Sequence, residues 1–280
     1  MASDSTYVLS RGPAEVTRLI LQHFLWKKMY GYVIHPRIPV ENPHLRIADI
    51  GTGTATWLLE VGESLPETVH LDGFDISLET TPPVGYLPSN MTLYSWNILD
   101  PVPQHAIEAY DIVHIRHFIL VLDDTKAAIA LDHLLQLMKP GGFLQWDEWD
   151  LYACRSVARS MSVSTDGHDE LKHLTWQIIP HDNHKWITNC SGFLSDASLQ
   201  IMAQETLETP AHLAWLSQPL IMETILSMKA GLKNQDGDTK EIDQIFFKVQ
   251  NETKKGIAMN LKGCIVVCKK ADAQEARLAD

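Results

Sequence analysis

The chain has 280 residues, of which 45% are hydrophobic and 21% are charged. This is the composition of an ordinary globular protein, and it excludes a largely disordered chain. With 23 Lys and Arg against 35 Asp and Glu, the formal net charge is −12. That balance argues against a nucleic-acid partner, because phosphate backbones are bound by clustered cations.

The cysteine pattern bears on the compartment. No two of the four cysteines show a CxxC spacing. We therefore expect reduced thiols and a cytoplasmic protein. The segment Met1–Ser10 lacks the apolar stretch of a signal peptide, and no apolar run approaches the length of a membrane span. We expect no membrane association.

The N-terminal part is predicted as an extended arm over residues 1–11 followed by a helix over 13–30. Proline is tolerated in a first helical turn, as at Pro13. Apolar residues recur at helical spacing and are expected near one face: Val16, Leu19, Ile20, Phe24 and Trp26. A proline-rich connection follows over residues 35–43.

From residue 45 the pattern changes to strands alternating with helices. The predicted strands cover 46–50, 70–76, 91–95, 110–115 and 143–146, and the helices cover 54–63 and 123–138. The second helix is expected to stop at Pro140-Gly141-Gly142. This alternation predicts a doubly wound, mostly parallel sheet with right-handed crossovers.

Beyond residue 150 the alternation breaks. Residues 151–187 are expected to be helical but irregular. A sixth strand over 199–207, helices over 215–232 and 239–254, and a last strand over 257–269 are predicted. Because helices separate the last strand from the others, it can run antiparallel to them.

The strongest local signal is the segment Asp49-Ile50-Gly51-Thr52-Gly53, between a predicted strand and a predicted helix. Glycines at such a place let the backbone turn tightly and approach a ligand closely. Asp75 ends the next strand, where a carboxylate can accept both ribose hydroxyls of a nucleoside cofactor. The alternative is a plain tight turn, with Asp75 capping the next helix.

Two nucleoside cofactors compete for this loop. A dinucleotide would place pyrophosphate on it, and its fingerprint has Gly or Ala where this chain has Thr56. Asp49 would repel pyrophosphate, whereas it complements an amino-acid ammonium group. Both details favour S-adenosylmethionine, which carries an ammonium and a sulfonium but no phosphate. A dinucleotide-dependent oxidoreductase stays as an alternative.

Four segments in sequence carry a wider resemblance: Ile47–Gly53, Leu71–Ser77, Tyr110–Arg116 and Leu137–Trp146. Together they resemble class I S-adenosylmethionine-dependent methyltransferases, particularly the small-molecule methyltransferases of fungal secondary metabolism. The resemblance implies an α/β, Rossmann-like sheet of seven strands with the last one antiparallel. It also implies S-adenosylmethionine as cofactor and S-adenosylhomocysteine as product.

By position, the resemblance implies a set of cofactor contacts. Asp49, Gly51 and Gly53 would lie at the methionine end, and Asp75 would hold the ribose. Many relatives have Asp where this chain has Asn97, but the amide oxygen of Asn can still accept a hydrogen bond from adenine.

Further contacts follow from the same resemblance. Ile76 and Ile98 would lie against the adenine, and the backbone near Arg116 would line the methionine moiety. Residues 1–35 resemble the family's N-terminal lid. From this lid Tyr7 and Arg11 would close over the cofactor, and the guanidinium of Arg11 would bind the carboxylate of its methionine moiety.

The expected organisation has four parts. They are an N-terminal arm and helical lid over 1–40, a cofactor-binding core over 41–150, a helical acceptor-pocket insertion with the sixth strand over 151–260, and the last core strand and tail over 261–280.

Methyl transfer is an in-line displacement, so the chief task of the protein is to align the acceptor with the methyl group. An acceptor of high pKa also needs a base. The first candidate is His117, beyond the fourth strand, because ligands bind at the carboxyl ends of parallel strands. Asp147 and Glu148 come next. Four histidines of the variable segment are further candidates: His168, His173, His181 and His184. No metal site is expected.

The expected reaction is methylation of a small secondary metabolite, with oxygen as the default acceptor atom. Eight tryptophans suggest an aromatic or apolar acceptor. One alternative is a cyclase of the same fold that binds the cofactor without transferring the methyl group. Another is a methyltransferase-like regulatory protein. The sequence leaves open whether the chain forms a homodimer.

Overall fold

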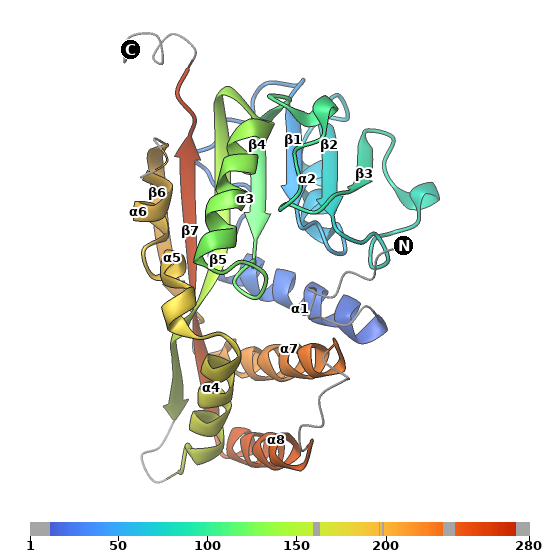
Figure 1. Ribbon diagram of the computed structural model, residues 1–280. Helices are drawn as coiled ribbons and strands as arrows, with labels where there is room; N and C mark the ends of the chain where they lie inside the picture. The colour runs from blue at the N-terminus through green and yellow to red at the C-terminus, as the bar shows by residue number, and fades with distance from the viewer. Residues whose placement is uncertain (1–11, 159–162, 196, 198, 232–238, 273–280) are drawn as a thin grey trace. The chain divides into compact units, whose positions relative to one another are not determined.

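The structure is a computed structural model that describes residues 12–158, 163–195, 197, 199–231 and 239–272. The predicted arm over 1–11, with Tyr7 and Arg11, lies outside the described residues. The described residues form one seven-stranded sheet in the order β3-β2-β1-β4-β5-β7-β6 (Figure 1).

The elements alternate as predicted up to the fifth strand. The strands are β1 (Arg46–Ile50), β2 (His70–Asp75), β3 (Met91–Ser95), β4 (Tyr110–Arg116), β5 (Met138–Ala158), β6 (Gln200–Glu208) and β7 (Ile257–Lys269). The helices are α1 (Pro13–Tyr30), α2 (Thr56–Ser64), α3 (Asp124–Leu137), α4 (Asp166–Ile178), α5 (Lys185–Thr188), α6 (Cys190–Ser195), α7 (Ser217–Gly231) and α8 (Thr239–Lys254). Short 3-10 helices are η1 (Val84–Tyr86), η2 (Gln104–Ala106), η3 (His181–Asn183) and η4 (Ala214–Leu216).

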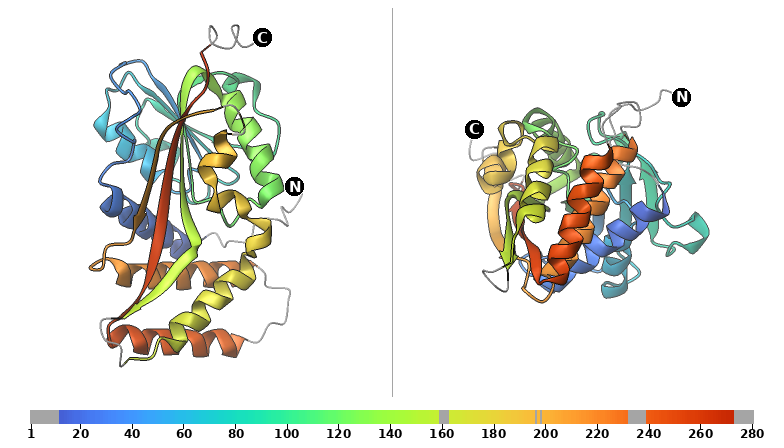
Figure 2. Two further views of the ribbon diagram at one scale, coloured as in Figure 1. Left: turned by 90° about the vertical axis from the view of Figure 1, so that its left-hand side faces the viewer. Right: turned by 90° about the horizontal axis from the view of Figure 1, so that it is seen from below.

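The sheet is parallel from β3 to β5, because β1 pairs with β2 and β4, β2 with β3, and β4 with β5 in that sense. The last strand is antiparallel to β5. Its continuation brings Lys270 N–H to the carbonyl of Gly142 at 2.9 Å and Ala271 O to the N–H of Gly141 at 3.3 Å. Helices α2 and α3 lie on opposite faces of these strands (Figure 1 and Figure 2). The predicted fold class is confirmed.

Local sequence explains the central elements. Ile47, Ala48 and Ile50 of β1 are buried, which is typical of a parallel strand covered on both faces. Helix α3 begins where the Asp123 carboxylate accepts the N–H of Lys126 at 2.9 Å. This cap satisfies one of the donors that a helix start leaves open.

The extent of β5 differs from the prediction, which placed a strand over 143–146 and helical structure over 151–187. Strand β5 begins at Met138 and runs to Ala158, and α4 begins only at Asp166. Helix α3 ends at Leu137, close to the predicted end, but the Pro140-Gly141-Gly142 segment already lies within the next strand, where the register with β4 shifts. Gly141 has φ +76°, so a glycine-dependent bulge takes the place of the expected helix cap.

The predicted apolar face of α1 is also wrong in part, since Ile20 and Phe24 are 48% and 44% exposed. Polar residues of α1 are buried instead. The Arg18 guanidinium donates to Glu15 at 2.9 Å and to Gln22 at 2.8 Å. Because these groups satisfy one another within the helix, burying them costs far less than burying them singly.

Within the described residues the chain divides into two compact units. One draws on the ranges Met1–Met29, Trp149–Asp182 and Leu207–Gly263 and is called the helical unit below. The other draws on Tyr30–Glu148, Asn183–Thr206 and Cys264–Asp280 and is called the sheet unit. Strands β5, β6 and β7 contribute residues to both units.

In the helical unit, α4 packs closely against α8 (Figure 2). A Cβ atom at Gly167 would lie 2.6 Å from the Cβ of Lys248, so the contact depends on glycine. Across the described part of the chain, no helix has the length and apolar character needed to cross a bilayer.

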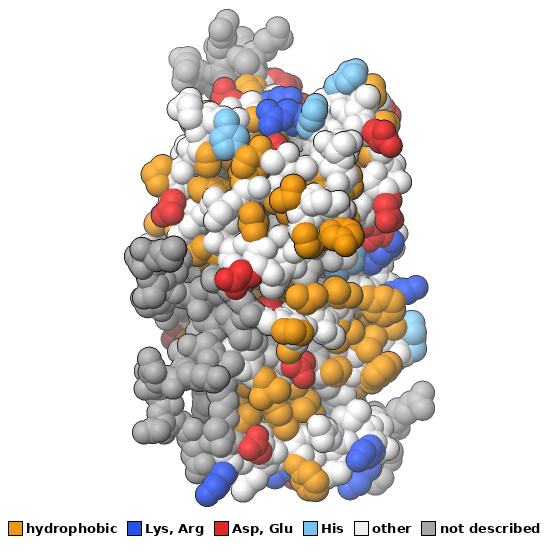
Figure 3. All heavy atoms as spheres, turned by 90° about the vertical axis from the view of Figure 1, so that its right-hand side faces the viewer, with side chains coloured by type: hydrophobic (Ala, Val, Ile, Leu, Met, Phe, Trp, Pro, Cys, Tyr) orange, Lys and Arg blue, Asp and Glu red, His pale blue; other side chains and the backbone are white. Residues whose placement is uncertain are grey.

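Hydrophobic side chains are also exposed on the surface, as the face drawn in Figure 3 shows. The most exposed in the sheet unit are Val84 and Tyr86 of η1, at 85% and 82%. Single exposed apolar side chains are normal for a folded protein and indicate no partner by themselves. The four cysteines, Cys154, Cys190, Cys264 and Cys268, are buried free thiols, which agrees with the expectation that they are reduced.

Candidate active site

The carboxyl ends of β1, β2, β3 and β4 meet at one edge of the sheet unit, because these strands are parallel neighbours. Backbone hydrogen bonds join the segments that follow them. The N–H groups of Gly51 and Thr52 donate to the carbonyl of Phe74 at 2.8 and 3.0 Å, and Trp96 N–H donates to the carbonyl of Asp75 at 2.8 Å. The structure thus brings together the loops in which the cofactor residues were predicted.

The glycine turn after β1 needs glycine at its first position. Gly51 has φ +69° and Gly53 has φ +55°, in the left-handed region that residues with a Cβ rarely adopt. A Cβ at Gly51 would also overlap the ring of Phe118. Both the backbone angle and the neighbouring ring therefore exclude a larger residue there.

Asp75 is tied to this turn. Its Oδ2 accepts the N–H of Gly53 at 2.8 Å, and its Oδ1 accepts the N–H of Ser77 at 3.1 Å. Each carboxylate oxygen has a second lone pair, so the group can also accept from two neighbouring hydroxyls. Ile76 follows directly after this carboxylate and is half-buried.

The loop after β3 is shaped by Asn97, whose Oδ1 accepts the N–H of Leu99 at 3.1 Å. Its carbonyl accepts the N–H of Asp100 at 2.8 Å. The next residue, Ile98, is buried, and its carbonyl lies 2.6 Å from Nδ1 of His133. The amide of Asn97 thus already serves a turn, a structural use that leaves its oxygen one further lone pair.

His117, just after β4, has a left-handed backbone with φ +64°. Its N–H donates to the carbonyl of Asp147 at 3.0 Å, and its Nδ1 lies 3.9 Å from Oε1 of Glu148. The carboxylate of Glu148 also accepts the N–H of Phe118 at 2.7 Å and is fully buried. Backbone strain of this kind clusters at functional sites, so the geometry keeps His117 as a candidate.

A buried row of polar side chains crosses β1, β4 and β5 beneath the glycine turn, and sequence reasoning missed its central member. His114 Nδ1 lies 2.7 Å from Oδ1 of Asp49, and its Nε2 lies 3.2 Å from Oδ2 of Asp147. All three side chains are at most 4% exposed. A histidine among the apolar residues Ile112, Val113 and Ile115 of β4 was the available signal, because a buried polar group needs partners.

The row continues beyond Asp147. The amide of Gln145 donates to the Asp147 carboxylate and to the carbonyl of Val33, and its oxygen accepts the N–H of His35 at 2.8 Å. His35 in turn lies 3.1 Å from Glu205. A chain of polar contacts, buried except at Glu205, therefore runs across the sheet face as far as β6.

Charges along this row shift several pKa values. A hydrogen bond from Tyr32 lowers the pKa of Glu205, with a further contribution from His35. Burial and the Glu205 carboxylate raise the pKa of Tyr32. Burial lowers the pKa of Arg116, whereas the charges of Asp147 and Asp49 act to raise it. Arg116 therefore lies within the field of both carboxylates.

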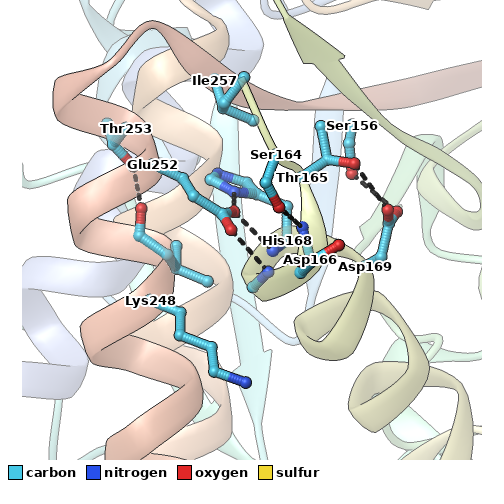
Figure 4. A network of polar contacts seen from close by, with 12 residues as sticks. Ser156, Ser164, Thr165, Asp166, His168, Asp169, Lys248, Glu252, Thr253 and Ile257 are labelled. Atoms are coloured by element: carbon cyan, nitrogen blue, oxygen red, sulfur yellow. Dashed lines mark hydrogen bonds and ion pairs between the residues drawn. The ribbon is translucent and has the colours of Figure 1, made fainter. Parts of the chain in front are cut away.

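Among the candidate histidines of the variable segment, His168 is fully buried in the packing of α4 against α8 (Figure 4). Its Nδ1 lies 2.6 Å from Glu252, whose carboxylate also accepts the N–H groups of Gly167 and His168 at 2.8 and 3.1 Å. Its Nε2 contacts the amide of Gln218. These contacts give His168 a clear structural use within the helical unit.

The other three histidines lie in more open places. His173 Nδ1 lies 2.6 Å from the carbonyl of Asp169 one helical turn back. His181 is exposed and packs edge-on against the ring of Tyr152. His184 precedes α5 and is half-buried.

A family model described as "Methyltransferase domain" matches residues 25–205. The chain belongs to this methyltransferase-domain family. The matched range includes every described residue predicted to contact the cofactor, from Asp49 to Arg116.

Among relatives of this methyltransferase-domain chain is the N-methyltransferase tcpN of Claviceps purpurea, 39% identical over 147 residues, which are 51% of this chain and 52% of the relative. Methyltransferase grgD of a Penicillium species is 34% identical over 52% of this chain and 53% of the relative. The N-methyltransferase verN of Clonostachys rogersoniana is 32% identical over 50% and 49%. The chain spans about half the length of the curated relatives it matches.

Solved structures share the fold. Phosphoethanolamine N-methyltransferase 2 of Haemonchus contortus aligns with a TM-score of 0.53 at 11% identity, over 97% of this chain and 61% of that one. The [4+2]-cyclase SpnF aligns with a TM-score of 0.50 at 14% identity, over 97% and 86%. At such low identity the likeness shows the fold alone.

Proposed function

We propose that this chain is an S-adenosylmethionine-dependent methyltransferase that methylates a nitrogen atom of a small secondary metabolite. The observation that carries the proposal is the family match, which covers the glycine turn, Asp75 and the loops after β3 and β4. Four of the fungal relatives are N-methyltransferases by name. Their names favour nitrogen over the oxygen that the sequence analysis takes as default.

The residues at the carboxyl edge fit this cofactor. Asp75 offers two oxygens to the vicinal hydroxyls of a ribose. Asp49 is buried directly below the glycine turn, where its carboxylate contacts Thr52 and His114, and in this proposal it supports the turn that receives the amino-acid end of the cofactor. When bound, the cofactor supplies an electrophilic methyl group on a sulfonium.

The chain's own task is to hold both reactants in line. The glycine turn and the backbone near Arg116 hold the amino-acid end of the donor, Asp75 holds the ribose, and the loop of Asn97 and Ile98 holds the adenine together with Ile76. Orientation of this kind can supply several kcal/mol of the barrier.

Proton removal from the acceptor falls to His117 in this proposal. Its imidazole lies beside the carboxylate of Glu148, which stabilises the ring once it has taken up a proton. Asp147, the second predicted base, already accepts hydrogen bonds from His114 and Gln145 and is 1% exposed. The contacts therefore favour His117 over Asp147 as the base.

The acceptor we propose is a small aromatic or apolar molecule that carries a nucleophilic nitrogen. The eight tryptophans of the chain support this choice, because aromatic side chains are common in sites that bind flat apolar molecules.

The test uses S-adenosylmethionine with a deuterated methyl group and a panel of amines, phenols and thiols matched in size. Product masses are measured with and without the chain. A labelled methyl group on nitrogen supports the proposal, whereas one on oxygen corrects the acceptor atom. A product isomeric with its substrate indicates a cyclase instead. A folded chain that binds no S-adenosylhomocysteine by calorimetry contradicts the proposal and favours a regulatory role.

A further inference from the structure

His114 lies in β4 between the apolar residues Val113 and Ile115, and its side chain is 1% exposed. In the sheet, His114 pairs with Asp49 of β1 on one side and with Gln145 of β5 on the other. Its ring lies between two carboxylates, with Nδ1 2.7 Å from Asp49 and Nε2 3.2 Å from Asp147. All of these residues belong to the sheet unit.

Hydrogen-bond chemistry determines the charge of this ring. An ionised carboxylate only accepts, whereas a neutral imidazole has one N–H and an imidazolium has two. Carboxylates at both ring nitrogens are therefore both satisfied only by the imidazolium. Burial alone lowers the pKa of His114, but the hydrogen bonds to Asp147 and Asp49 and their charges raise it above its ordinary value of 6.5.

Residues from three neighbouring elements contact the ring. From α2, Trp57 stacks on it with ring centroids 3.8 Å apart and planes at 2°. The charged groups that act on its pKa are Asp49 on β1 and Asp147 on β5, and the same two carboxylates act on Arg116 of its own strand. Arg116 provides the second positive charge, so two buried carboxylates are matched by two cations.

Asp49, through its carboxylate, and Asp147, through its backbone, extend the connection toward the candidate active site. Oδ2 of Asp49 accepts the hydroxyl of Thr52 at 2.7 Å, and Thr52 lies between the two glycines of the turn. The backbone carbonyl of Asp147 accepts the N–H of His117 at 3.0 Å. His114 is thus the link between the glycine turn and Asp147 in the middle of β5.

We propose that His114 is a positioning residue, whose imidazolium joins Asp49 to Asp147 and so holds the glycine turn in the geometry that receives the amino-acid end of the methyl donor. The inference rests on the proposed function, because that function supplies the ligand. His114 acts through Asp49 and Thr52 and does not touch the ligand. Its loss therefore affects ligands that carry the amino acid and spares those that lack it.

The binding test compares two ligands by calorimetry at pH 7. S-adenosylhomocysteine has the amino-acid part, and 5′-methylthioadenosine lacks it. His114→Gln should weaken S-adenosylhomocysteine about tenfold, the loss expected for a hydrogen bond to a charged group, and leave 5′-methylthioadenosine unchanged. The matched control is His70→Gln, at an exposed position of β2, which should change neither affinity.

Each result has one meaning. Unchanged S-adenosylhomocysteine affinity in His114→Gln, or an equal loss for both ligands, overturns the positioning role. A wild-type chain that binds neither ligand contradicts the proposed function instead.

A second measurement needs no folded variant. In the wild-type chain with ¹⁵N-labelled histidine, long-range ¹H–¹⁵N spectra should show one buried ring protonated on both nitrogens at pH 7, because the contacts of His114 raise its pKa above the ordinary value of 6.5. If every buried ring is neutral at pH 7, His114 does not form the two-carboxylate bridge and the proposal is wrong.

Discussion

Replacing Asp75 with alanine tests the placement of the ribose. In the structure the carboxylate accepts the N–H groups of Gly53 and Ser77, and in the proposed function it also accepts the two ribose hydroxyls. A hydrogen bond to a charged group contributes about 1.5–3 kcal/mol. Asp75→Ala should therefore weaken S-adenosylhomocysteine binding by about 10- to 150-fold, measured by calorimetry.

The variant also removes an acceptor from the glycine turn, so a second ligand separates the two effects. With 2′-deoxy-S-adenosylhomocysteine, the wild-type chain should lose affinity by a similar factor, whereas Asp75→Ala should lose little more. This cycle isolates the contact between the carboxylate and the hydroxyl. Unchanged affinity in Asp75→Ala, or an equal penalty for the deoxy ligand in both proteins, would refute the reasoning.

Three further changes have expected outcomes. Gly51→Ala places a Cβ against the Phe118 ring on a residue whose φ is +69°. The free energy of unfolding in urea should fall by about 1–3 kcal/mol and cofactor binding should weaken, whereas unaltered stability would contradict this geometry of the turn. Glu252→Ala removes the carboxylate shared by α4 and α8 and should lower the free energy of unfolding in urea by about 2–4 kcal/mol. The control Glu241→Ala, at an exposed position of the same helix, should leave it almost unchanged, and equal losses in the two variants would argue against the network of Figure 4. The pKa of Glu205 is lowered from 4.5, so the ionised carboxylate stabilises the folded chain above that pH, and this stabilisation is lost as the pH falls through the lower folded pKa. In Glu205→Gln the free energy of unfolding should therefore fall less steeply on the acid side. An identical fall in both proteins would count against the contact of Glu205 with Tyr32 and His35.

Much of the sheet could be predicted from the sequence, because buried parallel strands and glycine turns leave strong local patterns. The segment from Arg46 to Ile50 is an apolar run followed by glycine, and the structure has a strand over the same residues. The place of Asp75 beside the glycine turn could also be predicted, because adjacent parallel strands end at one edge of a sheet.

The length of β5 could not be predicted, because the sequence at its start is compatible with two local structures. A Pro-Gly-Gly segment after a helix resembles a helix stop, yet here it forms a bulge in a strand that pairs with β4. Pairing with neighbouring strands decided the outcome, and pairing depends on residues distant in sequence.

The His114 row could not be assembled from the sequence because its contacts join distant positions. His114 meets Asp49 across a separation of 65 residues and Asp147 across 33. Likewise, the buried polar side of α1 depends on Arg18 finding Glu15 and Gln22, so hydrophobicity alone assigned the wrong face to Ile20 and Phe24.

The most direct measurement of the central claim is a crystal structure of the chain grown with S-adenosylhomocysteine. The account predicts the ribose hydroxyls within hydrogen-bond distance of Asp75 and the amino-acid end at the Gly51–Gly53 turn. A ribose bound elsewhere, or a turn without ligand at saturating concentration, would contradict it.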